Sequence, residues 1–217
     1  VDRVLYDRSA TRNDCFIAEF SERYEHKSRV RETDLGDLIA DAFLDIYKPD
    51  FVIVQSGSIR LKSCGPDVKL ETLKKLYPYD DNYVTVALTG KEIRQAFLYL
   101  FSLKPDGSVM NGTFQYSRGF KLIADMENYK ERGCRMEYIG LNGEALDDDR
   151  IYTVGLTKNC LRKFKRYFGF AVPEERVSLT AISTFSDLAR WMIAQNETIT
   201  VRDRGRFEIL HEEYLDT

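Results

Sequence analysis

Residues 29–60 read RVRETDLGDLIADAFLDIYKPDFVIVQSGSIR, and this stretch decides how the chain is expected to fold. Its first half carries apolar residues at the i, i+3, i+4, i+7 spacing of one buried helix face. These residues are Leu35, Leu38, Ile39, Ala42, Phe43 and Ile46. Thr33 or Asp34 is placed to cap the first turn, and Pro49 cannot continue the helix. Residues 51–54 are apolar throughout and predict a short strand buried on both faces.

An arginine stands at each end of this stretch, beside small or polar residues. Arg29 precedes the predicted helix, and Arg60 follows the tight turn 55–59 at the carboxyl end of the predicted strand. Ligands commonly bind at this end of a strand in α/β proteins. The planar guanidinium fork suits a phosphate or carboxylate group, so both arginines would serve one anion if helix and strand pack side by side. A solvated arginine without a ligand is the alternative for either residue.

The composition limits the domain organisation and the class of partner. The chain has 217 residues, 43% hydrophobic and 31% charged, with a net charge of −3, which fits one sizeable domain or one domain with an extra arm. Residues 1–28 are weakly patterned and predict an N-terminal arm or inter-domain segment, followed by one domain over 29–217. The low net charge argues against a nucleic-acid duplex as partner. No apolar run approaches the roughly 18 residues of a transmembrane segment.

Histidine and cysteine do not form a catalytic or metal-binding pattern. His26 and His211 are the only histidines and stand far apart, so neither an imidazole-based metal site nor a Ser–His–Asp or Cys–His set is predicted. The four cysteines form no C-x-x-C pair, which excludes zinc-ribbon and thioredoxin interpretations and favours buried or free thiols. We therefore predict no catalytic residue and no metal ligand in this chain.

The rest of the chain interleaves predicted helices and strands. The predicted helices cover 69–76, the segment after the Thr89–Glu92 capping box, and 184–195, where Thr184 and Asp187 have capping-box spacing. The segment 158–167 is basic and partly helical in pattern. The predicted strands are 83–88, 113–116, 119–124, 135–141, 151–156 and 207–210. This order is typical of an α+β fold, a mixed β-sheet with packed helices.

Aromatic residues stand in two places where they could contact a planar ligand. Tyr79 follows Pro78 in a predicted loop, and Tyr167, Phe168 and Phe170 surround Gly169. Two facing aromatic planes can hold a purine or pyrimidine base, with about 1–3 kcal/mol from each stacking contact. The alternative is that these rings pack in the core or at its rim.

Five segments, in this order, resemble the C-terminal domain of the 5′-nucleotidase family, which includes UDP-sugar hydrolases, ecto-5′-nucleotidase and 2′,3′-cyclic phosphodiesterase/3′-nucleotidases. Residues 29–42 are similar to the family's R-x-x-E-T/S-N-L-G-N-L-x-x-D-A signature, and QSGSIR at 55–60 is similar to its N-G/S-G-x-I/L-R turn. The other three are YPY at 77–79 with the strand and TG that follow, FQYSRG at 114–119, and LNGEAL at 141–146. The resemblance implies the family's C-terminal-domain fold over most of the chain.

The resemblance also implies a division of labour between two domains. In such enzymes an N-terminal metallophosphatase domain holds two divalent metal ions, and the C-terminal domain binds the nucleotide. We expect that domain to precede Val1 in the same polypeptide, which would explain the scarcity of histidine here. The chain alone is then expected to be inactive, and the whole protein to be extracellular, periplasmic or at the cell surface.

By motif, the resemblance assigns substrate contacts to particular residues. The implied contact residues are Arg29, Arg60, Gln55, Gly57, Tyr79, Tyr167 and Phe168. The two arginines would hold phosphate, and Gln55 would stand where the family has an Asn near the sugar and phosphate. Tyr79 would form one face of the base sandwich, and Tyr167 or Phe168 the other.

One departure from the family pattern supports a second hypothesis. Where the family has a G-G-D-G-F/Y turn, residues 162–170 read RKFKRYFGF. The basic segment 158–166 and the missing glycines fit a diverged, non-catalytic interaction or structural module of the same fold. The two hypotheses remain open at the level of sequence.

Overall fold

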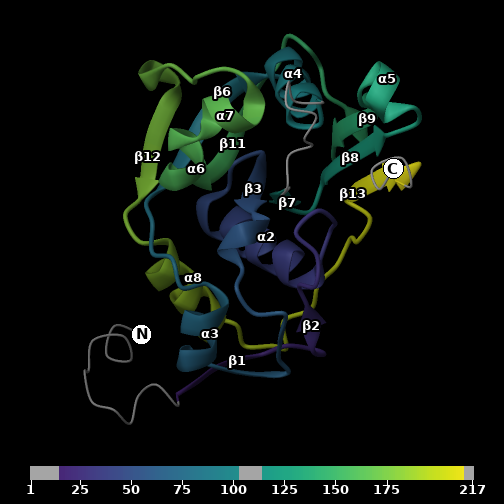
Figure 1. Cartoon of the computed structure of the whole chain (residues 1–217). Helices are drawn as coiled ribbons and strands as arrows, with labels where there is room; N and C mark the ends of the chain where they lie inside the picture. Colours follow the sequence, from purple (N-terminus) through teal and green to yellow (C-terminus); the bar gives the residue numbers. More distant parts are fainter. Residues whose placement is uncertain (1–14, 103–113, 213–217) are drawn as a thin grey trace.

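The computed structural model describes residues 15–102 and 114–212, and its centre is a five-stranded mixed sheet (Figure 1). The strand order is β12-β6-β11-β3-β7, with β3 and β11 parallel and the other neighbours antiparallel. The strands are β3 (Phe51–Gln55), β6 (Tyr83–Thr89), β7 (Phe114–Tyr116), β11 (Ile151–Thr157) and β12 (Val177–Ala181). The predicted α+β class with a mixed sheet is confirmed.

A second sheet and two short strand pairs complete the β-structure of the described residues. The second sheet has the order β10-β9-β8-β13, with β13 parallel to β8. Its strands are β8 (Phe120–Asp125), β9 (Arg135–Leu141), β10 (Glu144–Ala145) and β13 (Phe207–Leu210). The short pairs are β1 (Phe16–Glu19) with β5 (Asp67–Lys69), and β2 (Tyr24–Glu25) with β4 (Ser63–Cys64). The sequence predicted neither the short pairs nor β12, an edge strand with a largely exposed surface.

The helices pack around these sheets. They are α2 (Asp34–Tyr47), α3 (Leu70–Leu76), α4 (Gly90–Leu100), α5 (Tyr129–Arg132), α6 (Lys158–Arg162), α7 (Phe164–Phe168) and α8 (Thr184–Ile193). Two 3-10 turns are η2 (Ser56–Ser58) and η3 (Glu174–Arg176). The capping box predicted at Thr89 and Glu92 is confirmed, because each of the two side chains accepts a hydrogen bond from the backbone amide of the other residue. The cap predicted at Thr184 is wrong, because Ser183 caps α8 and the buried Thr184 hydroxyl accepts from the Asp81 amide instead.

Strand β3 belongs to two hydrophobic clusters, one on each face of the central sheet. Phe51 and Ile53 pack with α4, α7 and the second sheet. Val52 and Val54 pack on the other side with α2, α3 and α8. All four side chains are at most 4% exposed, as a strand that is apolar on both faces requires. In Figure 1, α2 lies across the middle of the molecule next to β3.

The described part of the segment predicted as an N-terminal arm, residues 15–28, packs into the second of these clusters. Phe20 and Tyr24 are 1% and 0% exposed and contact the same core as α2. The Tyr24 hydroxyl accepts a hydrogen bond from the Val201 amide at 2.9 Å, which ties this segment to the C-terminal part of the chain. The alternating signal of such a short segment is weak, because its partner strands stand about 40 to 50 residues further along the chain.

Gln115 on β7 is buried against the first turn of α2. Its side-chain oxygen accepts from the Thr33 amide at 2.9 Å, and its side chain occupies the space beside Gly36. A Cβ at Gly36 would overlap the Gln115 amide. The glycine therefore allows α2 and β7 to approach closely, which explains its place inside a helix that it would otherwise weaken.

A buried charged network lies one turn further along α2. Arg206 is 2% exposed and donates to both carboxylate oxygens of Asp41 at 2.8 Å. Asp37 is 0% exposed, and burial, with the nearby carboxyl of Glu32, raises the pKa of Asp37 to about 9, although Arg206 opposes the shift. Arg206 is already neutralised by Asp41, so the carboxyl of Asp37 remains protonated at neutral pH.

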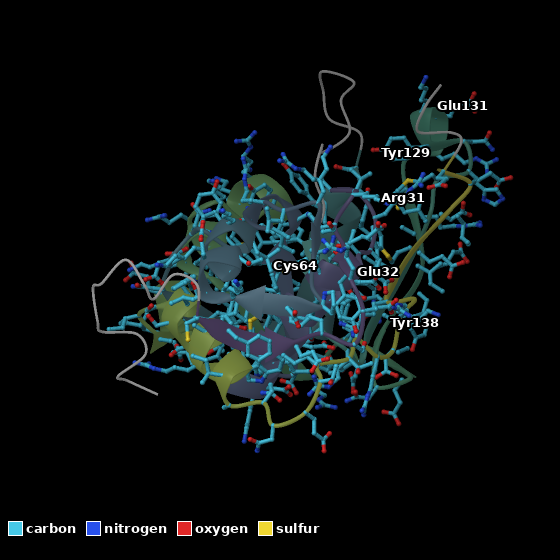
Figure 2. All side chains as sticks on the ribbon, turned by 90° about the horizontal axis from the view of Figure 1, so that it is seen from below. Arg31, Glu32, Cys64, Tyr129, Glu131 and Tyr138 are labelled. Carbon is cyan, nitrogen blue, oxygen red and sulfur yellow. The ribbon has the colours of Figure 1, made fainter. Side chains whose placement is uncertain are left out.

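Glu32 connects this network to the C-terminal segment. Its two carboxylate oxygens accept from the amides of Gly205 at 2.8 Å and Phe207 at 2.9 Å. Figure 2 shows Glu32 next to the yellow C-terminal segment, with Arg31 nearby. The start of α2 is therefore held from two sides, by Gln115 and by the residues around Arg206.

We predict that Gly36→Ala destabilises the protein by about 1–3 kcal/mol, because the added methyl group must displace the buried Gln115 amide. Urea unfolding followed by circular dichroism measures the change. Gly57→Ala is the matched control, since its Cβ would meet no atom within 4 Å and its φ is not positive. Equal stability of the two variants would contradict the proposed role of Gly36.

We predict that Asp37→Asn makes the protein less sensitive to alkaline pH. The raised pKa means that the folded state keeps a proton which the unfolded chain releases above about pH 4, so stability falls as pH rises from there to about 9. The slope from this group is at most about 1.4 kcal/mol per pH unit. The variant should therefore gain stability over the parent between pH 5 and pH 8.5 in urea titrations.

Asp41→Asn is the control for this experiment, because it removes the carboxylate that neutralises Arg206 and should destabilise the protein at every pH. An unchanged pH slope in Asp37→Asn would show that Asp37 is ionised in the folded protein.

Candidate functional site

Three segments meet at one edge of the central sheet, which we call the β3–β11 edge. Strands β3 and β11 are parallel, so their carboxyl ends lead into η2 and α6 at the same edge. Strand β6 is antiparallel to β11 and begins there, so the loop 77–82 also opens at this edge. Carboxyl ends of parallel strands are a common place for ligands in sheets of this kind.

Backbone hydrogen bonds hold the three segments together. The Arg60 amide donates to the Leu76 carbonyl at 2.8 Å, which places the end of η2 beside the start of loop 77–82. The Lys158 amide donates to the Asn82 carbonyl at 2.8 Å, and the Asn159 amide donates to the Asp81 carboxylate at 2.7 Å. Residues from three distant parts of the sequence thus form one surface.

Gln55 and Tyr167, both predicted site residues, are in direct contact at this edge. The Gln55 amide nitrogen donates to the Tyr167 hydroxyl at 2.9 Å, and its oxygen accepts from the Asn159 side chain at 3.2 Å. The sequence did not identify Asn159, because an Asn near the start of a helix is common. Burial raises the pKa of Tyr167, so its hydroxyl stays protonated at neutral pH.

Phe168 is a core residue, which corrects its assignment as a substrate contact. Its side chain is 2% exposed, and its ring stacks on Phe114 with centroids 5.2 Å apart. Phe164 and Phe168 stand one turn apart and form the buried face of α7, which turns Tyr167 toward the sheet edge. Phe168 and Tyr167 were the two candidates for the second stacking face, and only Tyr167 lies at the sheet edge.

Tyr79 lies on the surface of the loop that follows α3. Its side chain is 51% exposed, whereas the neighbouring Tyr77 is 1% exposed. No ring contact within the described residues joins Tyr79 to Tyr167. The structure thus brings Tyr79 to the same edge as the other site residues without placing the two rings against each other.

His26 joins the segment before α2 to the η2 turn. Its Nδ1 lies 2.7 Å from the Thr33 hydroxyl, and its Nε2 lies 3.0 Å from the Ser56 carbonyl. A carbonyl only accepts, so neutral His26 carries its proton on Nε2 and donates to Ser56. Burial and, to a smaller extent, the charge of Arg29 lower the pKa of His26.

Gln115 on β7 also joins the segment before α2 to the η2 turn. Its amide nitrogen donates to the Ser56 hydroxyl and to the Arg31 carbonyl, both at 2.9 Å. Gln115 belongs to the FQYSRG segment, but the sequence assigned no role to its side chain. With His26, it fixes residues 31–33 against the turn that contains Gln55 and Gly57.

Arg60 projects from the end of this turn into solvent. It is exposed, and its guanidinium donates weakly to the Gly57 carbonyl at 3.4 Å. Within the described residues, no carboxylate lies within 4.0 Å of the Arg60 side chain. The Arg60 charge is therefore not neutralised by a carboxylate of the described residues, and a Cβ at Gly57 would face open space.

The described part of the chain contains no group of three or more His, Cys, Asp or Glu residues that could hold a metal ion. Cys15, Cys64, Cys134 and Cys160 are free thiols. Burial raises the pKa of Cys64 to about 11, which makes it a poor nucleophile. No helix in the described residues is long and apolar enough to cross a membrane.

Comparison with known proteins relates this geometry to a family. The sequence model of the 5′-nucleotidase C-terminal domain matches residues 10–163. The chain is 32% identical over 130 residues to an apyrase of Anopheles gambiae, covering 57% of this chain and 22% of the relative. It is 24% identical over 126 residues to the protein UshA of Escherichia coli, covering 58% of this chain and 21% of the relative.

A solved structure shows the same fold. The 5′-nucleotidase precursor from Thermus thermophilus superposes with a TM-score of 0.73 at 21% identity, covering 91% of this chain and 40% of that one. The chain therefore spans about a fifth of the length of the two curated relatives and 40% of the Thermus protein. The chain belongs to the 5′-nucleotidase C-terminal domain family.

Proposed function

We propose that this chain binds a nucleotide and presents its phosphate ester to a metallophosphatase domain in the N-terminal part of a longer polypeptide. The observation that carries the proposal is the gathering of Gln55, Tyr167 and Arg60 at the β3–β11 edge. The small share of its relatives that the chain covers, 22% and 21%, supports a further domain. Hydrolysis then takes place outside this chain, which alone is inactive.

Each site residue has a role that follows from its chemistry. Arg60 and Arg29 contact the phosphate, because a guanidinium can bond two phosphate oxygens at once. Gln55, held by Asn159, bonds the sugar or phosphate through its amide. The nucleobase stacks on Tyr167 and on the exposed ring of Tyr79, which must move toward it.

The implied metal ions belong to the proposed N-terminal domain. Two divalent ions there would supply the attacking water and stabilise the charge on the phosphate. The residues of this chain bind and orient the nucleotide. We place the whole protein outside the cytoplasm, in the extracellular space, the periplasm or at the cell surface, as the family resemblance implies.

A non-catalytic interaction module is the second candidate. The exposed cations of α6 and α7 favour it, because they could contact an acidic protein surface. It would be preferred if Arg60→Ala changed no nucleotide binding while charge reversal at Arg162, Lys163 and Arg166 removed a protein contact.

We predict that the chain binds a nucleoside 5′-monophosphate and that Arg60→Ala weakens this binding about tenfold or more. A charge-assisted hydrogen bond contributes about 1.5–3 kcal/mol, which the variant loses. Tyr167→Ala should have an effect of similar size through lost stacking. Isothermal titration calorimetry on the chain measures both.

Arg132→Ala is the control for these variants, because Arg132 is an exposed arginine on α5, a helix next to the second sheet. It should leave the affinity within about twofold of the parent, since it lies outside the proposed site. Absence of saturable binding at millimolar nucleotide, or equal effects of Arg60→Ala and Arg132→Ala, would contradict the proposed function.

A further inference from the structure

The side of the site formed by α6 and α7 carries a concentration of positive charge that the nucleotide contacts proposed above do not use. We call it the basic rim, and it consists of Lys158, Arg162, Lys163, Lys165 and Arg166. All five side chains belong to exposed residues, although the chain as a whole has a net charge of −3. Figure 1 shows α6 and α7 side by side, next to β11.

The basic rim is not neutralised by the protein. Within the described residues, no carboxylate lies within 4.0 Å of any of its five cationic groups. Several arginines elsewhere are paired, for example Arg94 with Asp148 at 3.1 Å and Arg176 with Glu92 at 2.7 Å. Like charges at i and i+4, such as Lys158 and Arg162, destabilise a helix. A bound anion would relieve this repulsion.

Two acidic side chains of the loop 77–82, Asp80 and Asp81, are engaged in other contacts. Asp81 accepts from the Asn82 amide at 2.8 Å and from the Asn159 amide at 2.7 Å. Asp80 accepts from the Ser183 hydroxyl at 2.9 Å and the Phe185 amide at 3.2 Å. Asp81 thus holds the backbone of α6, Asp80 holds the start of α8, and neither forms an ion pair with the basic rim.

Hydrogen bonds connect the basic rim to the candidate site. Arg162 donates to the Asn159 side chain at 3.4 Å, Asn159 donates to Gln55 at 3.2 Å, and Gln55 donates to Tyr167 at 2.9 Å. At the other end, the charge of Arg166 acts on the Tyr167 hydroxyl and opposes the effect of burial on its pKa. Arg162 thus stands at one end of a continuous chain of polar side chains, and Arg166 directly precedes Tyr167 at its other end.

The position of these hydrogen-bonded side chains indicates what the basic rim binds. Arg60 lies on the η2 side of Gln55, whereas Arg162 and Arg166 lie on the α6–α7 side. A ligand whose sugar contacts Gln55 and whose base stacks on Tyr167 would meet cations on both sides. The rim is confined to two helices of five residues each, which suits one phosphate group better than an extended polyanion.

We propose that the basic rim is a subsite for a second phosphate on the sugar of the bound nucleotide, separate from the phosphate held by Arg60 and Arg29. This inference rests on the proposed function, because it needs a nucleotide in the site. The second phosphate has two sources with the same chemistry. It is the monoester of a nucleoside 3′,5′-bisphosphate or the 3′-phosphodiester of a short oligonucleotide.

Calorimetric titration of the chain with three ligands tests the proposal. The ligands are adenosine 5′-monophosphate, adenosine 3′,5′-bisphosphate and a 5′-phosphorylated adenosine dinucleotide. We expect the parent chain to bind the bisphosphate, the dinucleotide or both at least about tenfold more tightly than the monophosphate, as two further charge-assisted bonds allow. In Arg162→Gln/Arg166→Gln this preference should fall to about twofold or less.

The matched control is Lys130→Gln/Arg132→Gln, which removes two exposed cations from α5 and should keep the full preference. Tighter binding of the bisphosphate identifies the monoester as the occupant, and tighter binding of the dinucleotide identifies the diester. A parent chain that binds all three ligands equally, or a preference that survives Arg162→Gln/Arg166→Gln, overturns the subsite and leaves the proposed function intact. If no ligand binds, both proposals fail.

Discussion

The candidate site depends on the buried amide of Gln115. This side chain bonds the Thr33 amide, the Arg31 carbonyl and the Ser56 hydroxyl, and so joins the start of α2 to the turn after β3. A buried amide with unpaired polar atoms would be strongly destabilising, so these partners are required together. The turn with Gln55 and the segment with Arg29 are therefore positioned by one central group.

The site combines a rigid half with a more exposed half. The rigid half is η2 with Gln55. Gln115 and His26 form hydrogen bonds to Ser56 in this turn. Asn159 and Tyr167 form hydrogen bonds to the Gln55 side chain. The exposed half consists of Arg60 and Tyr79, whose side chains lie at the surface. This arrangement suits a domain that orients a nucleotide for another domain, since a preorganised polar turn lowers the ordering cost on binding.

Local signals predicted much of this architecture. The helical spacing and caps of α2, the capping box of α4 and the apolar run of β3 each depend on residues within one element, so they could be predicted from adjacent residues. Strands β1, β2 and β12 could not, because short strands are stabilised by partners distant in sequence. The cap of α8 shifted to Ser183 for a similar reason, since Thr184 is needed by a distant backbone amide.

The sequence by itself determined the α+β class, the helix and strand at the centre of the fold, and the family, because ordered motifs and local periodicity are properties of neighbouring residues. Only the tertiary structure decided that Tyr167, and not Phe168, turns to the sheet edge, because the burial of one face of α7 selects between adjacent residues. It also decided that His26 and Asn159 support the site. Their contacts reach across 30 and 104 positions, a distance over which no local pattern can act.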